Sequence, residues 1–369
     1  MKNFPILAMA RFGAGISEQF KDQNLVPMHN TNPEPFTQSE LEQTIGHSFI
    51  DILQNVDLGF APDAGTLALR QTLAKFHYET IATDDIVTHA GAQEALFCAF
   101  YALLQAGNKV LAVAPIFEPL VQIPLNIGCE VSYVHLNSEN NWSLNLDEVE
   151  EYFKQGCKMF IVNFPHNPTG ATLAASELSR IVALCKQYDV WLLSDEVFKG
   201  LEHSVEHKLP AVADLYDKGI SVGVISKGFG IPGIRIGWLV CKNRQLLGKV
   251  VNIKGYISVC NSQVDELLAS VILRKHEELT RRNLSFVLKN KKLLIDFNAV
   301  LGNKIEVFIP NAGCCIFAQT QTGAKMLVDK VAKQSNFLLY PSAVFKSKVQ
   351  AVRIGFGSKR FGEFLKAVN

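Results

Sequence analysis

The chain has 369 residues, of which 48% are hydrophobic and 19% charged, and its formal net charge is +1 at pH 7. This length predicts one large and one small domain in a globular protein. The near-zero charge gives no reason to expect nucleic acid or an anionic membrane surface as partner, and no apolar stretch is long enough to span a bilayer. The eight cysteines and nine histidines show no metal-ligand spacing, so we expect no metal site. Most cysteines lie in apolar runs, which favours reduced thiols in a cytoplasmic protein.

Strand-like runs alternate with helical patterns, such as 92–104 and 175–188, through the middle of the chain. The predicted strands span residues 86–89, 110–113, 130–135, 159–163, 190–194, 221–226 and 236–241. This alternation predicts an α/β fold: a three-layer α/β/α domain with a mostly parallel seven-stranded sheet, formed by residues 46–264. Charged helical sequence at 264–297, followed by strand-like pieces at 305–309 and 351–355, predicts a smaller α/β domain made of residues 1–45 and 265–369. In such sheets, chemistry gathers beyond the carboxyl ends of the strands.

The first such end carries the run THAGAQE, which closes a predicted strand and opens a helix. Gly91 allows a tight turn, and the backbone N–H groups of Ala92 and Gln93 would point out of the helix N-terminus. These features are typical of an anion site, because the helix dipole favours negative charge there. An ordinary strand-to-helix turn is the alternative.

Two further strand ends carry an aromatic ring and a rigid polar loop. Phe117 follows the strand at 110–113 and has the flat ring needed to stack on a planar cofactor. A phenylalanine of the hydrophobic core is the alternative. The run NFPHNPTG follows the strand at 159–163, and its two X-Pro steps hold the backbone extended. We expect this loop to aim Asn167 at a ligand oxygen.

A carboxylate stands at the end of the next strand, in the run LLSDEVF. Burying Asp195 after an apolar strand is costly unless the acid is paired. A protonated ring nitrogen of a cofactor would be a suitable partner. A helix N-cap aspartate is the alternative.

The run VISKGFGIPGIRIGW places Lys227 in a glycine-rich turn after an apolar strand, with Arg235 eight positions on. Lysines are rarely buried without a function, and a desolvated amine favours the neutral form that a Schiff-base nucleophile needs. We interpret Lys227 as the lysine that holds pyridoxal 5'-phosphate (PLP), with Arg235 on the phosphate; a surface-loop lysine is the alternative. The same run matches the dinucleotide pattern GxGxxG. We reject that interpretation because Pro232 disfavours a helix there and no acid follows at the required distance.

One more charge stands alone in an apolar strand near the C-terminus. Arg353 lies in the run VRIGFG. A bidentate clamp on a substrate carboxylate explains such an arginine, and a surface-facing strand position is the alternative.

Taken together, the runs AGAQEALF, NFPHNPTG, SDEVF, SKGFGIPGIRIGW and VRIGFG resemble the class I/II aminotransferases, the aspartate-aminotransferase-like PLP enzymes of fold type I. The resemblance extends from about residue 60 to 357 and implies a homodimer that acts on an amino acid and a 2-oxo acid. It gives each matching position a role. Lys227 and Asp195 would be catalytic, Asn167 and Arg353 would bind substrate, and the cofactor would contact Gly91, Ala92, Gln93, Phe117, Asn167, Asp195, Phe198, Ser226, Lys227 and Arg235.

Three positions depart from the family pattern. Phe60 and Phe198 stand where many members have tyrosines, and Val224 stands where many have a phosphate-binding serine, which Ser226 could replace. Each change removes a polar contact worth about 1 kcal/mol. The loss of the hydroxyl at Phe198 puts ordinary transamination in question.

Three hypotheses remain open on the sequence. The first is an aminotransferase for an L-amino acid. The second is a PLP-dependent cyclase or lyase for a guanidino amino acid, because the runs NFPHNPTG and RIGFG and the phenylalanine after the aspartate motif also resemble capreomycidine synthase; Glu34 or Glu118 could then hold the guanidinium. The third is a non-catalytic protein with the same fold, which the intact Lys227 argues against. The sequence does not name the substrate, although residues 29–34 and 256–261 are expected to select it.

Overall fold

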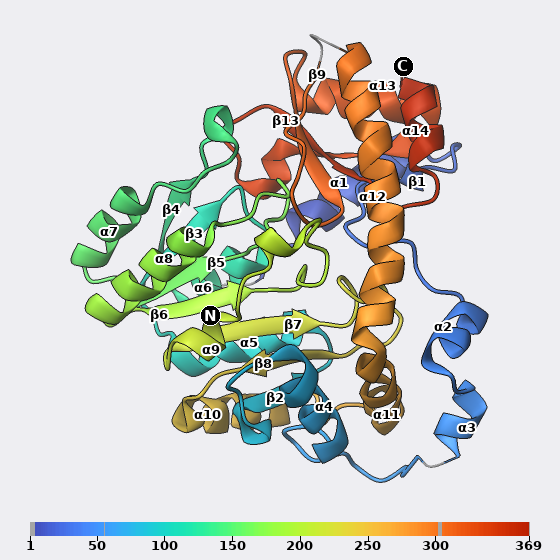
Figure 1. Ribbon diagram of the computed structural model, residues 1–369. Coiled ribbons are helices and arrows are strands. Elements are labelled where there is room, and N and C mark those ends of the chain that lie inside the picture. Colours follow the sequence, from blue (N-terminus) through green and yellow to red (C-terminus); the bar gives the residue numbers. More distant parts are fainter. Residues whose placement is uncertain (1–3, 55, 302–304, 369) are drawn as a thin grey trace.

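The computed structural model describes residues 4–54, 56–301 and 305–368. Its centre is a seven-stranded sheet in the order β2-β8-β7-β6-β5-β3-β4 (Figure 1). The seven strands are β2 (Ile86–His89), β3 (Lys109–Ala114), β4 (Glu130–His135), β5 (Met159–Val162), β6 (Trp191–Asp195), β7 (Gly219–Val224) and β8 (Gly237–Val240). Every strand lies where the sequence predicted one. Only β8 runs antiparallel to both of its neighbours.

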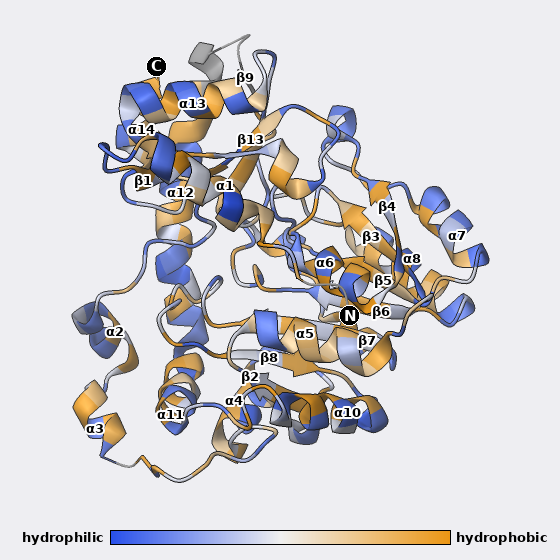
Figure 2. Cartoon of the chain, turned by 180° about the vertical axis from the view of Figure 1, so that it is seen from behind, coloured by the Kyte–Doolittle hydropathy of each residue, from blue (hydrophilic) through white to orange (hydrophobic). Residues whose placement is uncertain are grey.

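Residues that alternate along the strands sort onto opposite faces of this sheet. In β5, Phe160 packs in a core cluster with α7 (Leu146–Lys154) and α8 (Ala175–Gln187), whereas Ile161 packs in another with α5 (Ala92–Leu103), α6 (Pro119–Ile127) and α10 (Arg244–Gly255). Strand side chains point alternately to the two faces, so a sheet covered on both sides needs continuous apolar runs. Figure 2 shows the result, with apolar strands inside and polar outer surfaces on α7 and α10. The predicted three-layer α/β/α architecture is confirmed.

A third cluster closes the β2–β8 end of the sheet. It joins Trp238 of β8 to α2 (Gln38–Ile45), α3 (Phe49–Leu53), α4 (Leu67–His77) and α11 (Gln263–Ile272). From there α12 (His276–Leu301) runs past the large sheet to the C-terminal elements (Figure 1).

The C-terminal part contains a four-stranded antiparallel sheet in the order β12-β13-β10-β9. Its strands are β9 (Ile305–Glu306), β10 (Cys315–Thr320), β12 (Tyr340–Pro341) and β13 (Ala351–Gly355), and α13 (Ala324–Ser335) and α14 (Phe361–Val368) pack beside it. The strand predicted at 305–309 is shorter than expected, and the one at 351–355 matches. The N-terminal segment joins this part: α1 (Ala8–Gln19) is followed by β1 (Val26–Pro27), which pairs with β11 (Phe337–Leu338). The exact domain boundaries stay a prediction.

All eight cysteines are free, and seven of them are buried. No helix in the described part of the chain has the length and apolar character needed to cross a membrane.

Candidate active site

Lys227 lies in the turn between β7 and β8, at the carboxyl edge of the parallel strands. Its Nζ donates hydrogen bonds to Oγ1 of Thr31 at 2.7 Å and to Oδ1 of Asn32 at 2.6 Å. Burial lowers the pKa of the Lys227 amine from 10.5 to about 8. A substantial neutral fraction near pH 8 is the property expected of a nucleophilic lysine.

Asp195 is the last residue of β6, and 4% of it is exposed. Its Oδ1 accepts one hydrogen bond, from the backbone N–H of Val197 at 3.2 Å. Burial raises the pKa of the Asp195 carboxyl from 3.8 to about 7, with the backbone N–H and the nearby Lys227 acting in the opposite direction. A cationic partner would stabilise the ionised form of this buried carboxyl.

The loop after β5 is held by Asn163. Its Nδ2 donates to the backbone carbonyl of Asp195 at 2.8 Å, and its Oδ1 accepts the backbone N–H of Asn167 at 3.0 Å. The amide of Asn163 therefore fixes Asn167 relative to Asp195. Within the same loop, Nδ1 of His166 lies 2.8 Å from Oγ1 of Thr169, which satisfies a second buried polar group.

Arg353 comes from β13 of the small sheet, yet its guanidinium reaches this loop. Nη1 donates to Oδ1 of Asn167 at 3.0 Å, and the guanidinium carbon lies 4.8 Å from the ring centre of Phe345 and 5.6 Å from that of Tyr340. The residue is 5% exposed, and its Nε is buried with no hydrogen-bond partner among the described residues. A planar anion such as a carboxylate would satisfy it.

A second group of hydrogen-bond donors lies at the N-terminus of α5. Gly91 has φ +90°, and a Cβ added there would lie 2.7 Å from Nη2 of Arg235. Arg235 in turn donates from Nη1 to Oγ of Ser226 at 3.1 Å and to the carbonyl of Pro232 at 3.0 Å. The first backbone N–H groups of α5, from Ala92 onward, thus lie beside an arginine and a serine hydroxyl, which is the donor set that a phosphate requires.

Three further residues were predicted to contact the cofactor: Phe198, Phe117 and Gln93. Phe198 is 1% exposed, and its ring centre lies 5.9 Å from Nζ of Lys227. Phe117 is partly buried in the loop between β3 and α6, at the same edge of the sheet, and Gln93 is exposed in the first turn of α5.

Two of the three residues that differ from the family pattern, Phe60 and Val224, do not face Lys227. Phe60 is 88% exposed. Val224 is buried and lines a separate cavity of about 320 Å³ together with Tyr78 and Trp238. Neither residue adds a polar group to the donors at the N-terminus of α5 in this chain.

Residues 228–233, which match the dinucleotide pattern, contain no helix start, and the next helix begins only at Arg244. The rejection of that interpretation is confirmed.

Tyr340 had no predicted role, and His29, Thr31 and Asn32 were predicted only as part of the substrate-selecting segment 29–34. Thr31 and Asn32 bind the Lys227 amine, while His29 stacks on Tyr340 with ring centres 3.8 Å apart. Residues 29–34 were expected to select the substrate, but no local pattern indicates contact with the lysine or with a tyrosine more than 300 residues away.

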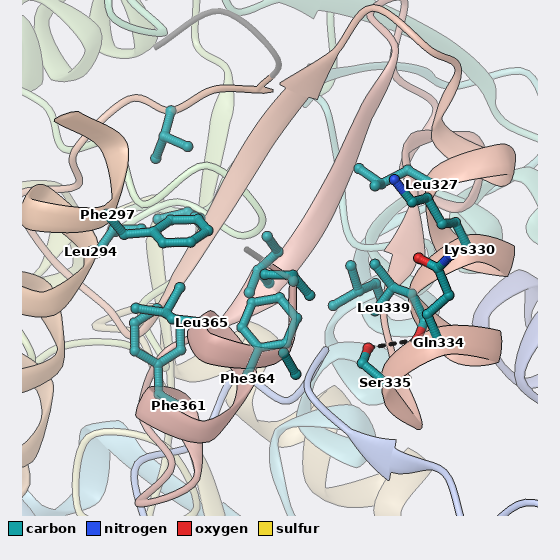
Figure 3. A pocket seen from close by; sticks show the side chains of 16 residues that line it. Leu294, Phe297, Leu327, Lys330, Gln334, Ser335, Leu339, Phe361, Phe364 and Leu365 are labelled. Carbon is teal, nitrogen blue, oxygen red and sulfur yellow. Dashed lines mark hydrogen bonds between the residues drawn. The ribbon is translucent and has the colours of Figure 1, made fainter. Parts of the chain in front are cut away.

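A second cavity, of about 190 Å³, has a mostly apolar lining and is separate from this site. Figure 3 shows it between α12, α13 and α14, with Phe297, Phe361 and Phe364 turned toward it and the polar Lys330 and Gln334 on α13. No residue of the candidate site lines it.

The family model for aminotransferase class I and II matches residues 33–360, and the chain belongs to this family. Among curated proteins, it is 27% identical over 277 residues to capreomycidine synthase of Streptomyces vinaceus, covering 74% of this chain and 70% of that one. It is 31% identical over 196 residues to arginine–pyruvate transaminase AruH of Pseudomonas aeruginosa, covering 52% of this chain and 50% of that one. Among solved structures, a PLP-dependent aminotransferase from Streptococcus suis superposes with a TM-score of 0.91 at 23% identity, covering 100% of this chain and 97% of that one. That likeness concerns the fold.

Proposed function

We propose that this protein is a PLP-dependent aminotransferase that moves the amino group of an L-α-amino acid to a 2-oxo acid. The observation that carries the proposal is the pairing of a lysine with lowered pKa, Lys227, and a buried carboxyl with raised pKa, Asp195, at one edge of the sheet. Opposite perturbations on neighbouring groups are the signature expected of a catalytic site.

The residues present fit PLP. The buried Asp195 carboxyl suits a protonated ring nitrogen, and the N-terminus of α5 with Ser226 and Arg235 suits a phosphate. When bound, PLP supplies an aldehyde that condenses with amines and a ring that withdraws electrons from the bond that breaks.

The chain's own groups then divide the work. Asp195 keeps the proton on the ring nitrogen. Asn167 and Arg353 orient the substrate carboxylate, which fixes the direction of the Cα–H bond. The Nζ of Lys227 would take the proton from the substrate Cα and deliver it to the cofactor carbon that carries the aldehyde in free PLP, and its pKa of about 8 suits both transfers. Thr31 and Asn32 accept hydrogen bonds from this amine and so keep it in place between the two transfers.

A homodimer in the cytoplasm is part of this proposal. The dimer is supported by the exposed side chains of Leu58, Phe60 and Tyr256, which are 84%, 88% and 96% exposed. Leu58 and Phe60 lie two residues apart in one loop, and such neighbouring exposed apolar side chains are typical of an interaction surface.

The second candidate function is a PLP-dependent cyclase or lyase for a guanidino amino acid. It is favoured by the similarity to capreomycidine synthase and by the phenylalanine at position 198. The acids suggested for the guanidinium have other partners: Glu118 accepts the backbone N–H of Ala8, and Glu34 accepts that of Lys359 at 2.9 Å. These contacts weaken the case for this candidate.

A product assay tests the proposal. The protein, PLP and a panel of L-amino acids, arginine derivatives included, are incubated with and without pyruvate or 2-oxoglutarate, and the products are identified by mass spectrometry. Amination of the oxo acid, dependent on the amino acid, is the expected result. Consumption of amino acids with no amination of any oxo acid would overturn the proposal, and cyclisation or elimination of an arginine derivative would support the second candidate.

A further inference from the structure

The side chains around Arg353 form an uncharged aromatic wall. His29 and Tyr340 stack with ring centres 3.8 Å apart and planes 4° apart, and the edge of Phe12 meets Tyr340 at 5.8 Å. The face of Tyr340 also lies near the Arg353 guanidinium. The wall therefore adjoins the group that would hold the substrate carboxylate.

His29 is neutral in this position. Burial and the positive charges of Arg353 and Lys227 lower the pKa of the imidazole from 6.5 to about 3. Apart from its own backbone, the described residues give the ring no hydrogen-bond partner, and the side chain is only partly buried. A neutral, partly accessible ring stacked on a tyrosine presents a flat surface and no charge.

Positive charges outnumber negative charges around Lys227 and Arg353. The groups that perturb Lys227 and Arg353 include only one carboxylate among the described residues, Asp195, which the cofactor would occupy. Glu118 is bound to the start of α1. A cationic guanidinium or ammonium side chain would find no free acid in this part of the chain. The two cations that act on His29 are Arg353 and Lys227, which the substrate carboxylate and the cofactor would occupy, so an acidic side chain would have to compete for one of them.

We propose that His29, held flat against the buried Tyr340, forms one wall of the side-chain subsite, and that the preferred substrate is an amino acid with an uncharged aromatic side chain. This inference rests on the proposed aminotransferase function. An aromatic ring gains dispersion and quadrupole contacts from a stacked pair in addition to the burial of its apolar area. His29 is thus a specificity-determining residue.

The first test measures turnover. The ratio of kcat/KM for L-phenylalanine to that for L-alanine is determined with pyruvate or 2-oxoglutarate as acceptor, for the wild type, His29→Ala and His29→Phe. We expect the ratio to fall about tenfold in His29→Ala and to be retained in His29→Phe, which preserves the flat ring. The control His207→Ala removes a partly exposed imidazole that pairs with Glu206, and should leave the ratio unchanged. A higher kcat/KM for L-arginine or L-aspartate than for L-phenylalanine would overturn the proposal.

The second test does not depend on turnover. Binding of 3-phenylpropanoate and of propanoate to the PLP-loaded protein is measured by calorimetry. Tighter binding of 3-phenylpropanoate, by about tenfold and lost in His29→Ala, supports the subsite even if no amino group is transferred. Equal binding of the two acids rejects the subsite, whatever the reaction proves to be.

Discussion

Arg353 and Asn167, which are 186 residues apart in sequence, bind each other directly: Nη1 of the arginine donates to Oδ1 of the asparagine at 3.0 Å. One residue belongs to β13 of the small sheet and the other to the loop after β5 of the large sheet. The two groups expected to hold a substrate carboxylate therefore already lie within bonding distance of each other.

This contact leads to a prediction for Arg353. Replacement by glutamine removes the charge-assisted bonds to the carboxylate, and we expect KM for the amino acid to rise by about 10- to 100-fold, with a smaller change in kcat. The control is Arg360→Gln, which removes a half-exposed arginine that pairs with Glu363. Steady-state kinetics on both variants check the prediction. A loss confined to kcat would show that Arg353 does not bind the substrate carboxylate.

Lys227 should be the attachment point of the cofactor. We expect Lys227→Ala to lose turnover and the visible absorbance of the lysine-linked cofactor, because the Lys227 amine lies close enough to Asp195 and Arg353 for their charges to act on it. Borohydride reduction followed by peptide mass spectrometry should locate the added mass on Lys227 of the wild type. Lys242→Ala is the matched control, since its Nζ lies outside the site and donates to the carbonyl of Asp214 at 3.2 Å. Label on another peptide would contradict the assignment.

Asp195 should make the cofactor-free protein less stable as pH rises. Its pKa of about 7 in the folded chain lies above the ordinary 3.8, so between these values the folded state binds more protons than the unfolded state, and stability falls. Asp195→Asn removes this dependence. Relative to the wild type, the variant should gain stability from pH 4 to pH 7, by on the order of 4 kcal/mol at most.

Urea unfolding at several pH values, compared between the two proteins, measures this difference. Buried histidines such as His77 and His166 have lowered pKa values and act in the opposite direction, but they are common to both proteins and cancel. A difference that does not change with pH would mean that the Asp195 carboxyl is not held neutral in the fold.

Phe198 offers a test of the missing hydroxyl. The ring lies next to the Lys227 amine, and a tyrosine there would donate a hydrogen bond to the oxygen of the cofactor ring. Such a donor stabilises the deprotonated form of the bound cofactor. We therefore expect Phe198→Tyr to lower the pH at which the visible spectrum of the bound cofactor changes. A spectrophotometric pH titration measures it, and an unchanged midpoint would show that position 198 does not set this pKa.

The large sheet could be predicted from sequence because its strands are buried on both faces. Continuous apolar runs such as β5 then stand out between helices, and the residues after them, Asp195 and Lys227 among them, identify the reactive edge. Strand 305–309 was predicted too long because its apolar residues continue past Glu306 into an irregular segment that packs against the core.

The contacts that the N-terminal segment makes in the site could not be predicted from apolar runs or local motifs. Thr31 and Asn32 reach Lys227 across almost 200 residues, and His29 finds Tyr340 only because β1 pairs with β11. Contacts of this kind depend on how distant segments pack, and neither periodicity nor a local motif encodes that arrangement.

The single reversed strand, β8, has a consequence for engineering. Because β7 and β8 are antiparallel neighbours, the one connection between them, residues 225–236, carries both Lys227 and Arg235, the proposed covalent and phosphate anchors of the cofactor. Arg353 sits on a different sheet. The small sheet that carries Arg353 could therefore be changed without altering the connection that holds Lys227 and Arg235. An insertion between residues 227 and 235 would instead change the spacing of these two residues.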